Sequence, residues 1–548
     1  MAISRRVQIK GDAARAGDRS IDEIIRPFGV ADRGITFLDN DKRTRLSYGD
    51  LAEQVQLVAA NIRREGVAPA ERIAMTLTND LQSVVVLLAA WAAGCTVVSL
   101  PPQSRGSRDW YAERFGSVLE RMDCEAVVDA SDTETSYLPR CSARVLTREN
   151  LLATRSGSPK PPGAEVPKIA LVQFTSGSVA APKGVAIAAD VLARHMTSLA
   201  QTAEIDPSRD KFVSWLPLYH DMGLVAMFLN ALASRSEQVL MPHRTFALQP
   251  ARWLATLARE RGTVTAAPNF AYRMASAVPY AAETDLSSVR VSINAGERVD
   301  WDVLMGFHEV TGPLGFDWGA VVPCYGLAEG VVGTTYTKPG RGARRHASGS
   351  VSVGRPMPGM LVEGPLGPPA GPISISGPCL FDGYNTVAGF VPQLVDSWFD
   401  TGDAGFIDEG ELHVMGRRAE TVSVAGHNVF AEDIEAVVHE KGRPSVRACA
   451  AFRLKESDQK FGLMIEINPR AIGSTTDIAS FAADLRATVI AALGVRVTVL
   501  LIVRLGTIPR TTSGKVQRAE CRELLSSAVI SRRIIISLGQ GDKGISVN

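Results

Sequence analysis

The sequence has little of what marks several common classes of protein. Its 7 cysteines are scattered over 548 residues and no Cys-x-x-Cys pair occurs, which argues against a disulfide framework and against a zinc site. Lysine and arginine total 59 against 58 acidic residues. The chain therefore has no basic field for nucleic acid and no acidic tail for a basic partner, and we expect no nucleic acid partner.

Uninterrupted apolar runs are also scarce. Residues 1–20 lack the apolar stretch of a signal peptide, so a cytoplasmic location is the default expectation. Residues 83–100 are nearly long enough to span a membrane. Gly94 divides this stretch into a helix-like and a strand-like part, and Pro101 ends it. The pattern predicts a buried helix followed by a buried parallel strand, and no membrane span.

Apolar runs that alternate with amphipathic stretches dominate the first 300 residues. A chain of 548 residues is too long for one core, so two or more domains are expected. The alternation indicates an α/β fold with mostly parallel strands, a large domain of packed sheets and helices. Strands are predicted over residues 71–77, 95–100, 168–177, 237–241, 262–267 and 289–296.

The composition and pattern of the sequence change twice in the second half of the chain. Residues 340–384 are rich in Gly and Pro, which is typical of a small β-region with tight turns. After Gly416 an α+β pattern begins, with helices near 431–441 and 476–493 and strands near 446–454, 461–469 and 495–503. We predict a large N-terminal domain (1–416), a hinge (417–419) and a smaller, mobile C-terminal domain (420–548). The tail contains residues 530–538, read as an edge strand or a disordered end without an assigned role.

A run of small and hydroxyl residues follows the strand predicted at 168–177. It comprises Thr175, Ser176, Gly177 and Ser178 and leads to Lys183. Such a loop can aim N–H groups and hydroxyls at phosphate oxygens, while the lysine supplies positive charge. It is not a Walker loop, because GxxxxGK[ST] is absent. Taken alone, the run is equally compatible with a solvated turn.

The run resembles the phosphate-binding signature of the adenylate-forming superfamily, which includes acyl-CoA synthetases, peptide-synthetase adenylation domains and luciferases. Val179 and Ala180 stand where that signature has Thr and Gly. Residues 324–329 resemble the Y-G-x-[TA]-E motif of the same superfamily. The resemblance implies that Glu329 helps to hold Mg²⁺ and that Tyr325 stacks on adenine. One carboxylate plus phosphate oxygens is an ordinary Mg²⁺ environment.

Further motifs follow in the order of the superfamily. Residues 294–299 resemble the loop beside the adenine, and residues 399–403 resemble the T-G-D motif, which implies that Asp403 binds the ribose hydroxyls. By the same resemblance Arg417 contacts the nucleotide, and Lys515 bridges the acid and the α-phosphate and stabilises charge during attack. The residues expected to bind ATP are Thr175, Ser176, Gly177, Ser178, Lys183, Gly296, Glu297, Arg298, Cys324, Tyr325, Gly326, Ala328, Asp403 and Arg417.

Several short segments of the sequence are most similar to those of fatty-acyl-AMP ligases, namely residues 215–224, 266–272, 323–329 and 513–518. These enzymes adenylate an acid and pass it to the phosphopantetheine of an acyl carrier protein, often in secondary metabolite biosynthesis. The resemblance implies that His220 lies at the carboxyl end of the acid pocket. Small and apolar residues at 222–233 favour a large apolar acid, linear or bulky. The expected activity is that of an acid–AMP and acid–thiol ligase that uses ATP and Mg²⁺.

Two departures leave the thiol acceptor open. Only residues 330–354 connect Glu329 to the next Gly-Arg-Pro, whereas fatty-acyl-AMP ligases usually carry an insertion there, so CoA stays an alternative to a carrier protein. The hinge position has Ala419 where Asp or Lys is usual, which leaves the energetics of rotation uncertain. Gly426 lies in a stretch that resembles the hairpin approaching the pantetheine arm. The alternatives are an acyl-CoA synthetase for a bulky acid, an enzyme of one half-reaction that relies on a partner, and a non-catalytic binding homologue.

Overall fold

The structure is a computed structural model of the chain. It describes residues 5–15, 20–25, 32–39, 42–102, 119, 122–128, 143–153, 167–174, 183–386, 389–391, 394, 396–424, 427–454, 460–469, 472, 474–510, 516–525, 527, 530, 532–539 and 545–547.

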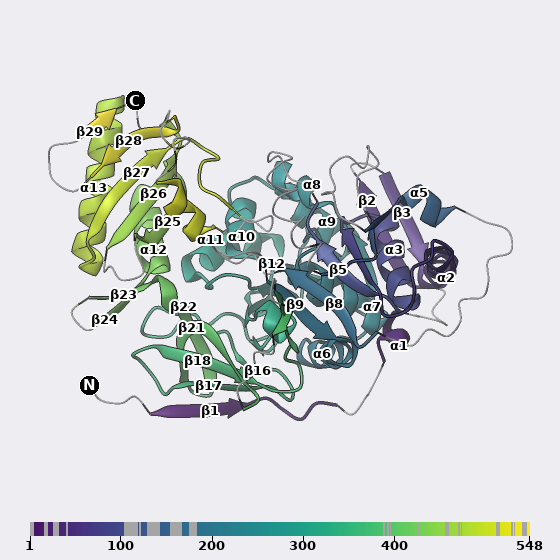
Figure 1. Cartoon of the computed structure of the whole chain (residues 1–548). Coiled ribbons are helices and arrows are strands. Elements are labelled where there is room, and N and C mark those ends of the chain that lie inside the picture. The colour runs from purple at the N-terminus through teal and green to yellow at the C-terminus, as the bar shows by residue number, and fades with distance from the viewer. Residues whose placement is uncertain are drawn as a thin grey trace.

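Two large sheets with parallel central strands form the N-terminal part (Figure 1). Among the described residues the first has eight strands, in the order β20-β19-β9-β8-β5-β4-β6-β7, and the second has nine, in the order β16-β15-β14-β13-β12-β10-β11-β2-β3. The first consists of β4 (Arg72–Thr76), β5 (Thr96–Leu100), β6 (Ala126–Val128), β7 (Arg144–Leu146), β8 (Ile169–Phe174), β9 (Gly184–Ala188), β19 (Gly383–Thr386) and β20 (Gly389–Val391). The second consists of β2 (Gly34–Asp39), β3 (Lys42–Ser47), β10 (Lys211–Ser214), β11 (Glu237–Leu240), β12 (Val264–Ala267), β13 (Val291–Asn294), β14 (Val321–Tyr325), β15 (Thr335–Tyr336) and β16 (Arg355–Pro356). The predicted α/β fold class is confirmed.

Helices lie between and around the two sheets. The helix α6 packs on β8 and β9 of the first sheet and on the π-helix η2, and η2 packs on β10 and β12 of the second sheet. The helices of this part are α1 (Ile21–Ile25), α2 (Tyr48–Arg64), α3 (Leu81–Ala92), α5 (Arg148–Leu152), α6 (Ala189–Thr202), η2 (Met222–Leu229), α7 (Asn230–Ser234), α8 (His243–Leu248), α9 (Ala251–Glu260), α10 (Asn269–Ser276) and α11 (Trp301–Thr311). The short 3₁₀ turns are η3 (Gly312–Leu314), η4 (Trp318–Ala320), η5 (Ala328–Gly330) and η6 (Arg418–Glu420).

The apolar stretch at 83–100 forms a buried helix and a buried strand. Asp80 caps α3 by accepting a hydrogen bond from the N–H of Ser83, and Gly94 has a φ of +75°, which ends the helical conformation. The strand β5 that follows is buried along its whole length and pairs in parallel with β4. The prediction for this stretch is confirmed. Among the described residues, no helix combines the length and the apolar character that a membrane span requires.

The Gly- and Pro-rich region contributes to a five-stranded sheet in the order β1-β17-β18-β21-β22. Its strands are β1 (Arg6–Lys10), β17 (Leu361–Pro365), β18 (Gly371–Ser376), β21 (Trp398–Asp408) and β22 (Glu411–Arg417). The pairing of β1 with β17 joins the N-terminal segment to this sheet, although no local pattern marked residues 6–10 as part of it. The hairpin β19–β20 adds instead to the first large sheet.

Residues 421–547 form what we call the C-terminal lobe. Apolar residues from Val422 onward make core clusters of their own, whereas the large core runs from Ile21 to Leu412. The lobe consists of β23 (Thr421–Val424), β24 (His427–Phe430), α12 (Ala431–Gly442), β25 (Val446–Arg453), β26 (Phe461–Ile467), α13 (Thr475–Leu493), β27 (Val497–Val503), α14 (Arg518–Leu524), β28 (Ile534–Leu538) and β29 (Ile545–Val547). The division at 417–419 stays a prediction.

The tail strand differs from its expectation. The segment at 530–538 contains β28, which lies between β27 and β29, so it is neither an edge strand nor a disordered end. Register pairs Ile502 with Ile536, and Ile536 is fully buried. The burial of this isoleucine explains why the tail belongs to the core of the lobe.

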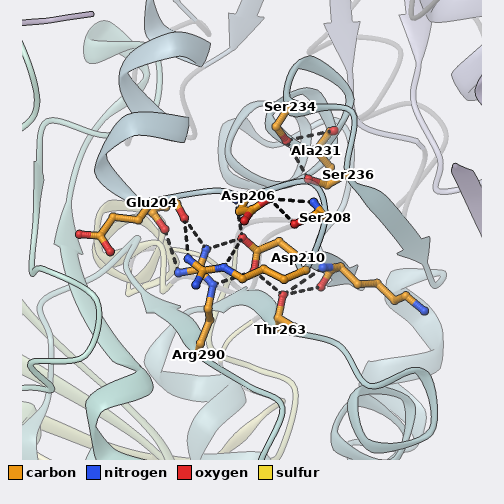
Figure 2. A network of polar contacts seen from close by, with 12 residues as sticks. Glu204, Asp206, Ser208, Asp210, Ala231, Ser234, Ser236, Thr263 and Arg290 are labelled. Carbon is orange, nitrogen blue, oxygen red and sulfur yellow. Dashed lines mark hydrogen bonds and ion pairs between the residues drawn. The ribbon is translucent and has the colours of Figure 1, made fainter. Parts of the chain in front are cut away.

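A buried ion pair ties α6 to the second sheet (Figure 2). Arg290, just before β13, contacts both carboxylate oxygens of Asp210 at 2.6 and 2.5 Å, and Asp210 is fully buried. The same guanidinium donates to the carbonyls of Ala203 and Glu204, and Thr263 donates to Asp210 at 3.0 Å. The full set of partners offsets the cost of burying the two charges and fixes the start of β13.

Candidate active site

Loops that follow neighbouring parallel strands meet at one edge of the nine-stranded sheet. β13 ends at Asn294 and β14 ends at Tyr325, and the two strands pair in parallel. Gly296, in the loop after β13, has a φ of +89°, a conformation that side chains other than glycine rarely adopt. Because α/β proteins bind ligands at the carboxyl ends of parallel strands, this edge is the candidate site.

Two residues from two different strands converge there on the carboxylate of Asp403, which lies on a third strand. The hydroxyl of Tyr325 donates to Oδ2 of Asp403 at 2.6 Å, and Nε of Arg417 lies 3.0 Å from Oδ1. β21 and β22 place Asp403 directly opposite Arg417. Three residues that the sequence assigned to ATP, far apart in the chain, are therefore in contact.

The pKa shifts of Asp403 and Tyr325 are those expected of a buried hydrogen-bond acceptor and its donor. Burial raises the pKa of the Asp403 carboxyl, and Arg417 and the Tyr325 hydroxyl partly lower it again. Burial and the neighbouring charge of Asp403 raise the pKa of the Tyr325 phenol well above its ordinary value. The phenol therefore stays protonated and can donate its hydrogen bond to Asp403.

A tight turn fixes the position of Glu329. Val331 has a φ of 67° and a ψ of −56°, and the N–H of Val332 donates to the carbonyl of Gly330 at 2.8 Å. This is a γ-turn of the strained kind, and a positive φ is a clear outlier for a β-branched residue. A Cβ at Gly326 would meet the carbonyl oxygen of Val332 at 1.8 Å, so only glycine fits beneath the turn.

Tyr384 connects Glu329 to the end of the predicted phosphate loop. Its hydroxyl donates to Oε1 of Glu329 at 2.5 Å, and Nζ of Lys183 lies 5.1 Å from the centre of its ring. Burial and the charge of Glu329 raise the pKa of the Tyr384 phenol, which keeps this donor protonated. The predicted metal-binding carboxylate and a predicted phosphate-binding lysine thus share one neighbour.

The AMP-binding enzyme family matches residues 30–385, more than half of the chain. The chain belongs to the AMP-binding enzyme family. This membership confirms the sequence prediction of an adenylate-forming ligase, and AMP-binding enzymes use ATP.

Relatives and solved structures support the placement. The 4-hydroxyphenylalkanoate adenylyltransferase of Mycobacterium tuberculosis is 31% identical over 512 residues, which covers 82% of this chain and 81% of that protein. The long-chain-fatty-acid–AMP ligase FadD26 of Mycobacterium bovis is 29% identical, with 87% and 91% covered. A structure from a study of fatty acyl-adenylate ligases of E. coli and L. pneumophila has a TM-score of 0.81 at 25% identity, with 93% and 98% covered. The resemblance to fatty-acyl-AMP ligases is confirmed.

The residues around Glu329 fit the magnesium that enzymes of this family usually use. No group of three or more His, Cys, Asp or Glu side chains gathers as a metal site within the described ranges. A single carboxylate completed by substrate phosphate oxygens is a normal Mg²⁺ environment, because Mg²⁺ keeps water and phosphate ligands readily. Glu329 suits that arrangement better than it would suit a metal held by protein alone.

His220 lies just before the apolar π-helix η2. None of its described contacts is with Asp403, Tyr325 or Arg417. Its Nδ1 lies 2.6 Å from Oδ1 of Asp221, and its side chain is about four-fifths buried. The π-helix η2 that follows is buried at every residue. π-helices are rare and often occur at functional sites, which agrees with a role of this helix in the pocket of an AMP-binding enzyme.

Two of the residues expected beside the adenine have protein partners. Glu297 accepts a hydrogen bond from the N–H of Phe270 at 3.1 Å. Arg298 forms an ion pair with Asp433 of α12 and donates to the carbonyl of Met415 at 3.2 Å. The side chain of Arg298 thus faces the C-terminal lobe, and its assignment to ATP stays a prediction that this contact does not favour.

The predicted catalytic lysine, Lys515, lies outside the described residues, but residues on both sides of it are described. Arg510 and Val516 pair as an antiparallel bridge. Glu466 of β26 is buried and accepts from the N–H groups of Thr507 and Ile508, both at 2.7 Å. A carboxylate that accepts two backbone donors holds the entry to this segment in place.

An arginine with three acidic partners holds the exit from the same segment. Arg518 contacts Glu420 at 2.6 Å, Glu432 at 2.9 Å and Glu435 at 2.8 Å. Glu420 belongs to η6, in which Ala419 also lies. The segment of the predicted lysine is therefore linked to the predicted hinge.

The other predicted residues divide into two groups. Cys324 is buried on β14, and burial raises the pKa of its thiol, so it is no candidate nucleophile; Ala328 opens η5. Thr175, Ser176, Gly177, Ser178 and Gly426 lie outside the described residues.

Sequence reasoning missed Tyr384 and Asp433. Tyr384 reaches Glu329 because β19 pairs with β9 of the first sheet, and the paired residues are about 200 positions apart in the sequence. Asp433 reaches Arg298 through the placement of α12. No local pattern around either residue carries this information, because both contacts arise from tertiary arrangement.

Proposed function

We propose that this ligase activates an apolar carboxylic acid with ATP to an acyl-AMP and then transfers the acyl group to a phosphopantetheine thiol. The convergence of Tyr325 and Arg417 on the buried carboxylate of Asp403 carries the proposal. A buried carboxylate is a suitable acceptor for two ribose hydroxyls. The matched family and the acid-activating relatives support the same reaction.

In the first step a carboxylate oxygen of the acid attacks the α-phosphorus of ATP. The new P–O bond forms as the bond to the β-phosphate breaks, and pyrophosphate departs. Asp403 and Arg417 hold the nucleoside, and Lys183 and Lys515 stabilise negative charge on the phosphates and in the transition state. Bound at Glu329, Mg²⁺ would neutralise charge on the phosphate oxygens.

Lys515 is the main charge-stabilising group in this proposal. We expect Lys515→Ala to lower the rate of acyl-AMP formation by about 10²–10³-fold, because removal of one positioned donor commonly has that effect. The measurement is ATP–pyrophosphate exchange over a panel of aliphatic and aromatic acids. Lys441→Ala is a matched control, because Lys441 forms a half-exposed pair with Asp484 within the lobe. Near-normal exchange by the Lys515→Ala variant would remove the lysine from the mechanism.

The buried π-helix favours an apolar acid. Every residue of Met222–Leu229 is buried, and the segment consists of aliphatic, Met, Gly and Phe residues. The relatives are named for 4-hydroxyphenylalkanoates and for long-chain and medium-chain fatty acids. The acids named for these relatives share an alkyl chain next to the carboxylate. Pyrophosphate release measured across the acid panel will identify the acid that this enzyme activates.

For the second step a carrier protein is the acceptor we favour. In that step the thiol sulfur attacks the acyl carbon, the thiol proton leaves and AMP departs. One relative, JamA of Moorena producens, is named a medium-chain-fatty-acid–[acyl-carrier-protein] ligase, 27% identical with 90% of this chain and 92% of that protein covered. CoA is a second candidate, because only residues 330–354 stand where fatty-acyl-AMP ligases usually carry an insertion. Thioester yield with CoA and with a carrier protein separates the two.

A further inference from the structure

An ion pair connects the loop after β13 to the C-terminal lobe. Nη1 of Arg298 contacts Oδ1 of Asp433 in the first turn of α12, and the same nitrogen donates to the carbonyl of Met415. The side chains of Arg298 and Asp433 are only 21% and 22% exposed. The contact is therefore shielded from most of the solvent and less screened by salt than a surface pair.

Each residue of this pair takes part in a further hydrogen bond. The carbonyl of Arg298 accepts from Nδ2 of Asn269 at 2.5 Å, which ties the loop to α10. The second oxygen of Asp433 accepts from the N–H of Phe430 at 3.0 Å, at the start of α12. Because the backbone of Arg298 and the side chain of Asp433 are already held, less conformational entropy opposes this pair than opposes one between two free surface side chains.

A second contact lies along the same helix. Nη1 of Arg273 on α10 lies 3.4 Å from Nε2 of His439 on α12, and Nη2 of Arg273 lies 3.5 Å from Asp300. Burial, together with Arg273, Arg443 and Arg510, lowers the pKa of His439 to about 3, so the imidazole is neutral near pH 7 and accepts a hydrogen bond. The charge of Arg510, which precedes the segment that bears Lys515, is thus one of those that act on His439.

The hairpin β23–β24, whose connection contains Gly426, lies elsewhere. Nδ2 of Asn428 lies 3.5 Å from the carbonyl of Ala370, next to the β17–β18 turn. Figure 1 shows this hairpin well separated from β8 and β9. The lobe therefore presents α12, and not the hairpin, to the α10 side of the N-terminal part.

We propose that Arg298 is a positioning residue whose ion pair with Asp433 holds the C-terminal lobe in the orientation that serves acid activation. For the hairpin that contains Gly426 to approach the acyl-AMP in the thioester step, as its resemblance implies, the pair has to open. The strength of the pair then sets how the enzyme divides its time between the two half-reactions. The inference rests on the proposed function. It also explains how orientation is held in a chain that has Ala419 at the hinge, because an alanine there supplies no charge for a pair.

The test uses the full-length protein with the single variants Asp433→Asn and Arg298→Gln and with both together. An asparagine oxygen still accepts from the N–H of Phe430, so α12 keeps its first turn. Asp484→Asn is the matched control, because it removes an acid from a pair with Lys441 that stays inside the lobe.

Two activities and one distance are measured for each variant. The activities are ATP–pyrophosphate exchange and the transfer of purified acyl-AMP to pantetheine. The distance is that between spin labels at Glu309→Cys on α11 and Ala483→Cys on α13, both exposed positions. A Cys141→Ser background is used, since the described cysteines are buried.

We expect each single variant to lower the exchange rate by about three- to tenfold without lowering the transfer rate. The label distances should broaden in the absence of substrate, and the double variant should be no worse than either single one. Equal losses in both activities, or unchanged distances, would overturn the proposal. A raised KM for ATP in Arg298→Gln alone would instead make Arg298 a nucleotide ligand. If wild type activates no acid, the proposed function fails and the distance measurement alone decides the role of the ion pair.

Discussion

Asp403 offers the sharpest test of how the site holds its nucleotide. Its two oxygens contact the hydroxyl of Tyr325 at 2.6 Å and Nε of Arg417 at 3.0 Å. The substitution Asp403→Asn keeps the shape and one acceptor oxygen but removes the charge. If this carboxylate accepts both ribose hydroxyls, the variant must lose affinity for ATP and leave the affinity for the acid unchanged.

The size of the loss follows from the change in hydrogen-bond type. A hydrogen bond to a charged group contributes about 1.5–3 kcal/mol and one between neutral groups about 0.5–1.5 kcal/mol, so two weakened bonds cost about 2–3 kcal/mol. That corresponds to a rise of about 30- to 150-fold in the KM for ATP. The assay is ATP–pyrophosphate exchange at saturating acid. Asp400→Asn on the same strand is the control, because its side chain is 58% exposed and pairs with Arg418. An unchanged KM in the Asp403→Asn variant would show that the ribose binds elsewhere.

Asp403→Asn should weaken ATP binding without lowering the stability of the fold near neutral pH. Burial raises the pKa of Asp403, so protonation of this group stabilises the fold at low pH, and that contribution is lost as the pH rises through the raised pKa. At pH 7–8 Asp403→Asn should therefore melt no earlier than wild type, and any gain should shrink in acid. Arg417 loses its partner, but its side chain is 53% exposed, which keeps that cost small. A clearly lower melting temperature at pH 8 would refute this account of the carboxylate.

Two further predictions concern the supports of the site. Arg290→Met leaves the fully buried Asp210 with Arg209, 3.8 Å away, as its remaining cation and should destabilise the protein by about 3–5 kcal/mol in urea unfolding. Arg43→Met removes a half-exposed partner of Glu260, which keeps its pair with Arg259, and should cost much less; equal effects in the two variants would contradict this ranking. Gly326→Ala places a Cβ 1.8 Å from the carbonyl oxygen of Val332 and should abolish most acyl-AMP formation, because it displaces the turn that carries Glu329. Gly306→Ala on α11, where a Cβ meets nothing within 4 Å, should leave activity unchanged and leave the stability of the fold unchanged or raised. Normal exchange activity in Gly326→Ala would show that the turn can shift freely.

Local pattern was sufficient wherever one segment determines its own structure. The buried strands β5 and β8, the helix α12 and the long helix α13 all lie where apolar runs and periodicity placed them. The division of the apolar stretch at Gly94 was visible because a glycine between a helix-like and a strand-like run has few other interpretations.

Contacts between distant segments could not be predicted in the same way. The assignment of Asp403 and Tyr325 to one nucleotide came from resemblance, and only the fold shows that their oxygens touch. Arg298 was grouped with the adenine loop by its position in the chain, yet its side chain meets Asp433 on another lobe. The tail strand β28 looked like an edge because its partner β29 is too short to recognise from sequence.

The first strand of the chain has a consequence for how the protein is made. Among the described strands β1 comes first in the sequence, and its partner β17 follows roughly 350 residues later. At about 5–20 residues per second, the ribosome needs roughly 20–70 s to reach that partner. During synthesis the β1 segment must wait unpaired while most strands of the two large sheets are made, and it can pair with β17 only afterwards. A bulky fusion at this end would therefore interfere with the last steps of folding more than with the first.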